Sequence, residues 1–147
     1  MQRRKVKEIP RNTQEMADKA LCHIQRIDVF DQNCASHQAV ARLADKWTLL
    51  LIYALAQGTK RYSELQRQIH GISPKMLTQT LRSLEEHGYI EREIFAEIPP
   101  RVEYSLTELG VSFVQPMAVL FEWAQEHRDH LMRIRARNAR KAAVAGG

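Results

Sequence analysis

The chain has 147 residues, 44% of them hydrophobic and 27% charged, so it can bury a core and is not a disordered polymer. Its formal net charge of +5 favours an anionic partner, and nucleic acid is the first candidate. No apolar run is long enough to span a bilayer, and the basic N-terminus has no apolar segment behind it, which excludes a secretory signal. We therefore expect a cytoplasmic protein that does not bind membranes.

Positive charge is concentrated at the two ends of the sequence. The clustered basic residues are Arg3, Arg4, Lys5 and Lys7 at one end and Arg133, Arg135, Arg137, Arg140 and Lys141 at the other. We expect residues 1–12 to be disordered and the last residues to fray. Such tails either contact phosphates or simply remain solvated, and composition does not choose between these alternatives.

Three helices are expected before residue 59. Apolar residues at three-to-four spacing predict a helix that begins at Thr13, its N-cap, and runs to about Ile27. A second helix is expected from about Cys34 to Leu43. The segment 46–58 is apolar nearly all round and predicts a buried helix that ends at Gly58, although its first half would also suit a buried strand.

Two further helices joined by a tight turn are expected in the segment 59–88. After the turn "GTKR", Ser63 is expected to cap a short helix. The next helix begins with Ser73 as N-cap and Pro74 in its first turn, and Gly88 is placed to end it. The inward stripe of this second helix consists of Leu77, Leu81 and Leu84.

The pattern then changes to the two-residue period of strands. The runs "YIEREIF" and "RVEYSLT", separated by "AEIPP", predict a β-hairpin with a stiff turn. Thr107 is expected to cap a last helix, which Pro116 should kink. This helix carries a coiled-coil-like seam of Phe113, Met117, Leu120, Ala124, His127, Leu131 and Ile134.

The order helix, helix, short helix, polar-faced helix, hairpin predicts a winged helix-turn-helix. Its fold class is mainly α with a small β-hairpin wing. The exposed face of the polar helix carries donors and positive charge, as expected for a helix that enters the major groove of DNA. The candidate DNA-binding residues are Arg61, Ser73, Lys75, Met76, Thr78, Gln79, Arg82 and Arg101. The plainer alternatives are a solvated helix face and, for Lys60 and Arg61, a solvated turn.

Three motifs resemble the HxlR-type winged helix-turn-helix transcription regulators: "KWT" at residues 46–48, "GISPKMLTQ" at 71–79 and "PPRVEYSLTELG" at 99–110. The resemblance covers roughly residues 34–123. It implies a homodimeric DNA-binding protein in which N- and C-terminal helices form the dimer and the wing touches DNA. We further expect a division into a basic arm and extra helix (1–30), a winged core (31–107) and a dimerisation helix with a basic tail (108–147). The dimerisation candidates are Phe113, Met117, Leu120, Ala124 and Leu131.

Some members of the family sense oxidants through a cysteine just before the first core helix, and Cys34 occupies that place. Ala35 follows it where the family often has proline, which weakens the comparison. Cys34 is therefore either a redox sensor or an inert buried thiol. Cys22 has no family counterpart and falls toward the polar side of its helix; a reversible bridge between the two cysteines has no support in the sequence.

Other chemistries fit poorly. The adjacent Cys22–His23 pair and the spacing to Cys34 and His37 match no standard zinc site, so no metal or other cofactor is expected. No Gly-rich phosphate loop and no marked Cys–His pair are present, so we expect no enzyme activity.

The expected function is that of a sequence-specific DNA-binding regulator, a homodimer on a pseudo-palindromic operator in the nucleoid, with an unidentified small-molecule effector as a further partner. Two rivals remain: a winged-helix module for protein–protein contact, and a redox enzyme that uses both cysteines.

Overall fold

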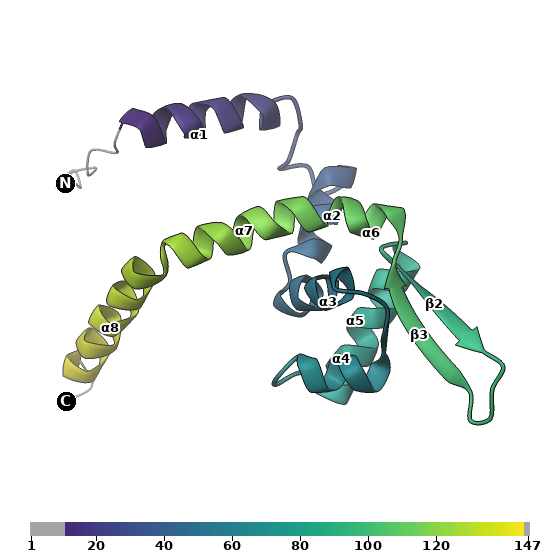
Figure 1. Cartoon of the computed structure of the whole chain (residues 1–147). Coiled ribbons are helices and arrows are strands. Elements are labelled where there is room, and N and C mark those ends of the chain that lie inside the picture. The colour runs from purple at the N-terminus through teal and green to yellow at the C-terminus, as the bar shows by residue number, and fades with distance from the viewer. Residues whose placement is uncertain (1–10, 146–147) are drawn as a thin grey trace. The chain divides into compact units, whose positions relative to one another are not determined.

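The computed structural model describes residues 11–145, in which helices predominate and three short strands form one sheet (Figure 1). The chain divides into two compact units, of which the first ends at Asp45 and the second begins at Lys46. The mainly α-helical fold with a small β-hairpin is confirmed. The basic cluster from Arg3 to Lys7 lies outside the described residues. None of the described helices is long and apolar enough to cross a membrane.

The first unit contains α1 (Arg11–Ile24) and α2 (Ala35–Leu43). The prediction of Thr13 as N-cap was wrong, because α1 already includes Arg11 and Thr13 lies inside its first turn. The expected start of α2 is confirmed, since Cys34 is its N-cap residue. The apolar side chains of Met16, Leu21 and Ile24 on α1 remain exposed.

The second unit is built around α3 (Lys46–Ala56), α4 (Tyr62–Gln68) and α5 (Pro74–Glu86). Each of these helices contributes leucines that solvent hardly reaches, and fully burying one such side chain stabilises the fold by about 1.5–3 kcal/mol. The expected helix 46–58 is confirmed, but it is not buried all round. Tyr53 on its outer face is 52% exposed.

The beginning of α4 differs from the prediction. Arg61, not Ser63, is the N-cap residue, and the helix starts at Tyr62. The backbone N–H of Arg61 donates to the Glu64 carboxylate at 2.7 Å. A glutamate three residues after the N-cap satisfies the free N–H groups at a helix start in this way, and Glu64 therefore outcompetes the Ser63 hydroxyl.

The sheet has three antiparallel strands, β1 (Lys60–Arg61), β2 (Ile90–Phe95) and β3 (Arg101–Leu106), in the order β1-β3-β2. Figure 1 shows β2 and β3 as the predicted hairpin. The segment expected to be only a turn, "GTKR", supplies β1, because its backbone pairs with the free edge of β3 with Arg61 opposite Glu103. The central strand therefore carries a partner on each side.

The predicted C-terminal helix is three helices: α6 (Glu108–Ser112), α7 (Val114–Glu126) and α8 (Arg128–Ala145). Thr107 is confirmed as a cap, since its hydroxyl accepts from the Gly110 N–H at 3.1 Å. The predicted kink at Pro116 was wrong, because the breaks fall at Phe113 and His127. Pro116 instead lies in the first turn of α7, where a missing N–H costs nothing.

Gly110 sets the position of α6. A β-carbon at this residue would collide with the backbone carbonyl oxygen of Tyr89. The absence of a side chain therefore lets α6 lie directly against the backbone that enters β2, which joins the start of the C-terminal helices to the base of the hairpin.

Candidate nucleic-acid interface

The helix α5 is defined at both ends as predicted. The Ser73 hydroxyl accepts from the Met76 N–H at 3.1 Å, and Pro74 occupies the first helical position. Gly88 follows the helix with a φ of +77°, a conformation that costs glycine little and that releases the chain into β2. Leu77, Leu81 and Leu84 are buried. The helix therefore presents one fixed face outward.

The outward face carries most of the predicted DNA-binding residues. Lys75, Met76, Gln79 and Arg82 are exposed, and the spacing of four and then three residues places Lys75, Gln79 and Arg82 in one row. Ser73 is also exposed, beside the free N–H groups of the first turn. A row of long donors along the exposed face of a helix suits phosphates and base edges in a major groove.

Thr78 differs from its neighbours on α5. It is half-buried, and its hydroxyl lies 3.2 Å from the hydroxyl of Tyr62 on α4. The Tyr62 hydroxyl also donates to the Pro74 carbonyl at 3.0 Å, so the Thr78 hydroxyl is left to donate to Tyr62. Thr78 therefore links α5 to α4. The sequence analysis did not identify Tyr62, because a single tyrosine at the start of a helix belongs to no recognisable sequence pattern.

A second tyrosine lies beneath α5. Tyr104 on β3 lines a small cavity together with Arg82 and Arg92. Burial raises the pKa of the Tyr104 phenol, and the nearby Arg92 opposes this only in part. Arg92 is itself paired with Glu85 of α5 at 3.3 Å. This pair and the half-buried phenol connect the hairpin to α5.

The wing arginine, Arg101, follows Pro99 and Pro100 and forms ion pairs within the wing. Arg101 is the first residue of β3, and its guanidinium lies 3.2 Å from Glu97 and 3.5 Å from Glu103. The same group stacks over the ring of Phe95 at 4.1 Å. Only 29% of the side chain is exposed. Neither glutamate was singled out from the sequence, because a carboxylate in a turn (Glu97) or in an alternating strand (Glu103) is typical of an ordinary solvent-facing residue.

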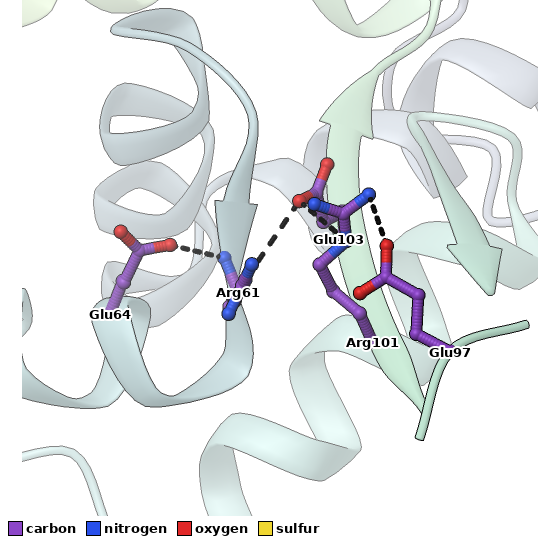
Figure 2. Close-up of polar contacts among 5 residues, drawn as sticks. All are labelled: Arg61, Glu64, Glu97, Arg101 and Glu103. Atoms are coloured by element: carbon purple, nitrogen blue, oxygen red, sulfur yellow. Dashed lines mark hydrogen bonds and ion pairs between the residues drawn. The ribbon is translucent and has the colours of Figure 1, made fainter. Parts of the chain in front are cut away.

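Arg61 lies next to this cluster. Its Nε is 3.8 Å from Glu103, and 53% of its side chain is exposed (Figure 2). Lys60, half-buried, lies opposite Tyr104 in β3. The structure therefore brings Arg61 and Arg101 together on one face of the sheet, whereas Lys75, Gln79 and Arg82 form a separate row on α5.

The predicted seam divides between two environments. Met117 is buried in its own unit, and Phe113 and Ala124 are half-buried. Leu120 and Leu131 are exposed, together with Val119, Trp123 and Met132, which the seam did not include. Leu120 and Trp123 are each about half exposed, at 50% and 51%. The outer side of α7 and α8 therefore presents large apolar side chains without cover from the described part of the chain.

Both cysteines are free thiols in the first unit. Cys22 is exposed, as predicted from its place on the helix, and Cys34 is partly exposed at the start of α2. An intermediate exposure leaves both alternatives for Cys34 open, a redox sensor or an inert thiol. Among residues 11–145, no group of three or more histidine, cysteine, aspartate or glutamate side chains could hold a metal ion.

Comparison with known proteins decides the family. A model described as HxlR-like helix-turn-helix matches residues 42–132. The chain belongs to this family. The HTH-type transcriptional regulator YtfH of Escherichia coli (strain K12) is 36% identical over 112 residues, which cover 76% of this chain and 89% of the relative. The family model matches residues 42–132, whereas the resemblance in the sequence analysis covered roughly residues 34–123.

Solved structures agree. The structure of the putative transcriptional regulator ytfH from Salmonella typhimurium has a TM-score of 0.67 and 34% identity, and the match covers 75% of this chain and 98% of that one. The reduced form of the redox regulator HypR has a TM-score of 0.63 and 36% identity over 67% of this chain and 97% of that one. This membership supports a DNA-binding transcriptional regulator and not the alternative of a module for protein contact.

Proposed function

We propose that this HxlR-like regulator acts as a homodimer that binds a pseudo-palindromic operator, with one α5 in each of two successive major grooves. The observation that carries the proposal is the exposed row of Lys75, Gln79 and Arg82 on a helix that is capped at both ends and anchored by buried leucines. A rigid helix holds these long donors at a fixed spacing, so that they can reach base edges together.

The remaining candidates are assigned to the DNA backbone. Ser73 and the first N–H groups of α5 would approach a phosphate, and Arg61 and Arg101 would contact the backbone beside the groove. Met76, exposed near the start of α5, would pack on a thymine methyl group or the sugar edge. In this arrangement the winged core of residues 31–107 binds DNA and residues 108–147 form the dimer.

The dimer is proposed from exposed apolar surface. Leu120, Trp123 and Leu131 lie uncovered on α7 and α8, and contiguous exposed apolar side chains of this size mark interfaces. Phe113, Met117 and Ala124, which are more buried, would support this surface from within. A two-fold dimer also explains why each half of the operator would resemble the other.

A redox response is the second candidate function. The specific observation is the similarity to HypR, a redox regulator solved in its reduced form, together with a partly exposed thiol at Cys34. Exposure is required for oxidation, and a helix beginning at the cysteine gives a modified thiol a direct way to move α2. The exposed Cys22 is a second candidate thiol.

An effector would have room within the second unit. A cavity of about 760 Å³ lies between α3 and α7, lined mainly by apolar side chains that include Tyr53, Met117 and Phe121. This is the size of pocket that small molecules occupy in proteins. A regulator of this kind would work in the cytoplasm, at the nucleoid.

The first experiment is fluorescence anisotropy with the DNA upstream of the protein's own gene, against scrambled DNA, at near-physiological salt and with the protein reduced. We expect preferential binding that weakens steeply with salt. Gln79→Ala should weaken specific binding by about 1–3 kcal/mol and relax base preference, and Lys75→Ala should lower the salt slope by about 1.

Lys19→Ala is the matched control, because it removes the same charge from the exposed surface of α1. Unchanged affinity in both α5 variants would refute the assignment of α5 to the major groove. A protein that fails to bind any DNA at low salt would refute the function itself.

A further inference from the structure

Four charged side chains are linked in a chain: Glu97 of the hairpin loop, and Arg101, Glu103 and Arg61 on one face of the sheet. Figure 2 shows the Glu103 carboxylate connected to both arginines. The same oxygen, Oε1 of Glu103, lies 3.5 Å from Nε of Arg101 and 3.8 Å from Nε of Arg61. A single carboxylate therefore joins two arginines that come from different elements of the fold.

The strand register creates this arrangement. Arg61 in β1 lies directly opposite Glu103 in β3, so the two side chains share a face of the sheet. Arg101 is two residues before Glu103 in the same strand and points to that face as well. Only 25% of the Glu103 side chain is exposed, which makes it the least exposed of the three.

The contacts leave the arginines oriented for a ligand. Glu103 lies at ion-pair distance from the Nε of each guanidinium, and the buried Nε of Arg101 has no hydrogen-bond partner among the described residues. For Arg61, the described residues offer no ion-pair partner to the two terminal nitrogens, which remain available to a phosphate. For Arg101, one face of the guanidinium stacks on Phe95, and Nη2 is held by Glu97, an exposed partner that a phosphate can replace.

Electrostatic repulsion alone predicts that Glu103 weakens DNA binding. A carboxylate near a DNA backbone repels it, so removing one should increase affinity. Long arginine side chains, however, lose much rotamer freedom when they become fixed on DNA, and a neighbour that fixes them beforehand reduces that loss. The two effects of Glu103 have opposite signs, and so they can be separated by measurement.

We propose that Glu103 is a positioning residue for DNA binding, which presets Arg61 and Arg101 toward the phosphate backbone. The proposal rests on the DNA-binding role proposed above for the two arginines. The repulsion between Glu103 and the phosphates is smaller than the loss that follows when both guanidinium groups are released.

The experiment measures anisotropy with the upstream duplex that binds the wild-type protein, over a series of salt concentrations. Glu103→Gln keeps the size of the side chain and removes its charge. We expect affinity to fall by about 5-fold or more and the salt slope to decrease by about 1–2, because phosphate contacts are lost. Affinity equal to or higher than that of the wild type would overturn the proposal.

Glu93→Gln is the matched control. Glu93 lies opposite Glu103 in β2, on the same face of the sheet, is exposed, and forms no ion pair with any described residue. The same change of charge at this position should leave affinity unchanged or slightly raise it. A loss like that of Glu103→Gln would assign the effect to the charge of the sheet face and not to positioning.

A third arm distinguishes positioning from a structural role. In the Arg61→Ala/Arg101→Ala background, Glu103→Gln should raise affinity, because only repulsion remains. A loss in this background would show that Glu103 merely supports the fold. Glu103→Asp, which keeps the charge and shortens the reach, should weaken binding in the wild-type background and serves if Glu103→Gln does not fold.

The outcomes also separate the two proposals. If the double arginine variant binds like the wild type, the arginines do not contact DNA, and both their role and the positioning role of Glu103 fail. If it binds weakly while Glu103→Gln and Glu103→Asp bind normally, the arginines contact DNA and only the positioning role is refuted.

Discussion

Replacing Tyr62 by phenylalanine isolates the contact that fastens α5 to α4. The Tyr62 hydroxyl donates to the Pro74 carbonyl at 3.0 Å and lies 3.2 Å from the Thr78 hydroxyl. The substitution removes one oxygen atom and leaves the ring in place. Both hydrogen bonds are then lost, while the apolar packing of the ring is retained.

The magnitude follows from the number and exposure of these hydrogen bonds. One hydrogen bond contributes about 0.5–1.5 kcal/mol net to the free energy of unfolding. Both distances are longer than the usual 2.7–2.8 Å of such bonds, and the bond to Pro74 is exposed, so each belongs in the lower half of that range. We expect Tyr62→Phe to lower the free energy of unfolding by about 1–2 kcal/mol, or Tm by roughly 2–8 °C.

Urea unfolding followed by circular dichroism measures this change. Tyr53→Phe is the matched control, because no hydrogen bond to the exposed Tyr53 hydroxyl is recorded from any described residue; its effect should stay within about 0.5 kcal/mol. Thr78→Val should be less destabilising in the Tyr62→Phe background than in the wild type, since the two changes remove the same interaction. Equal stability of the two phenylalanine variants would refute the link between α4 and α5.

Three further changes test other parts of the molecule. Gly110→Ala should destabilise the fold by about 3 kcal/mol in urea unfolding, because the new methyl group meets backbone; an unchanged midpoint would mean that α6 has room to shift. Diamide should change operator affinity by about 5-fold or more in the wild type and in Cys22→Ser but not in Cys34→Ser, and an equal response in both variants would exclude Cys34 as the sensor. Trp123→Glu should raise the dimer Kd by about 30-fold or more in analytical ultracentrifugation, whereas Gln115→Glu on an exposed position of the same helix should not; two unchanged values would exclude this face.

Local signals in the chain predicted α5 well. Ser73, Pro74 and Gly88 act through their own backbone geometry, and the leucine stripe needs only the helical period, so both ends and the inner face of α5 follow from neighbours within one or two turns. The hairpin likewise followed from alternation and two prolines. The family resemblance rested on the same segments.

The errors occurred where two local signals competed. Ser63 and Glu64 both suit the start of α4, and the preference for Glu64 depends on how the chain enters the helix from β1. Pro116 suits either a kink or a first turn, and only the break at Phe113 decides between them. Alternative helix starts and breaks of this kind differ little in free energy, so contacts with the rest of the fold decide between them.

By itself, the sequence determined most of the helices before the hairpin, the hairpin itself, the family and the row of donors on α5, because these depend on period, capping and motifs within short stretches. Only the tertiary structure decided that "GTKR" forms a strand, that Tyr62 holds Thr78, and that Glu103 joins Arg61 to Arg101. Arg61 and Arg101 are 40 residues apart in the chain. No local sequence pattern predicts which charged side chains the register of the strands brings together.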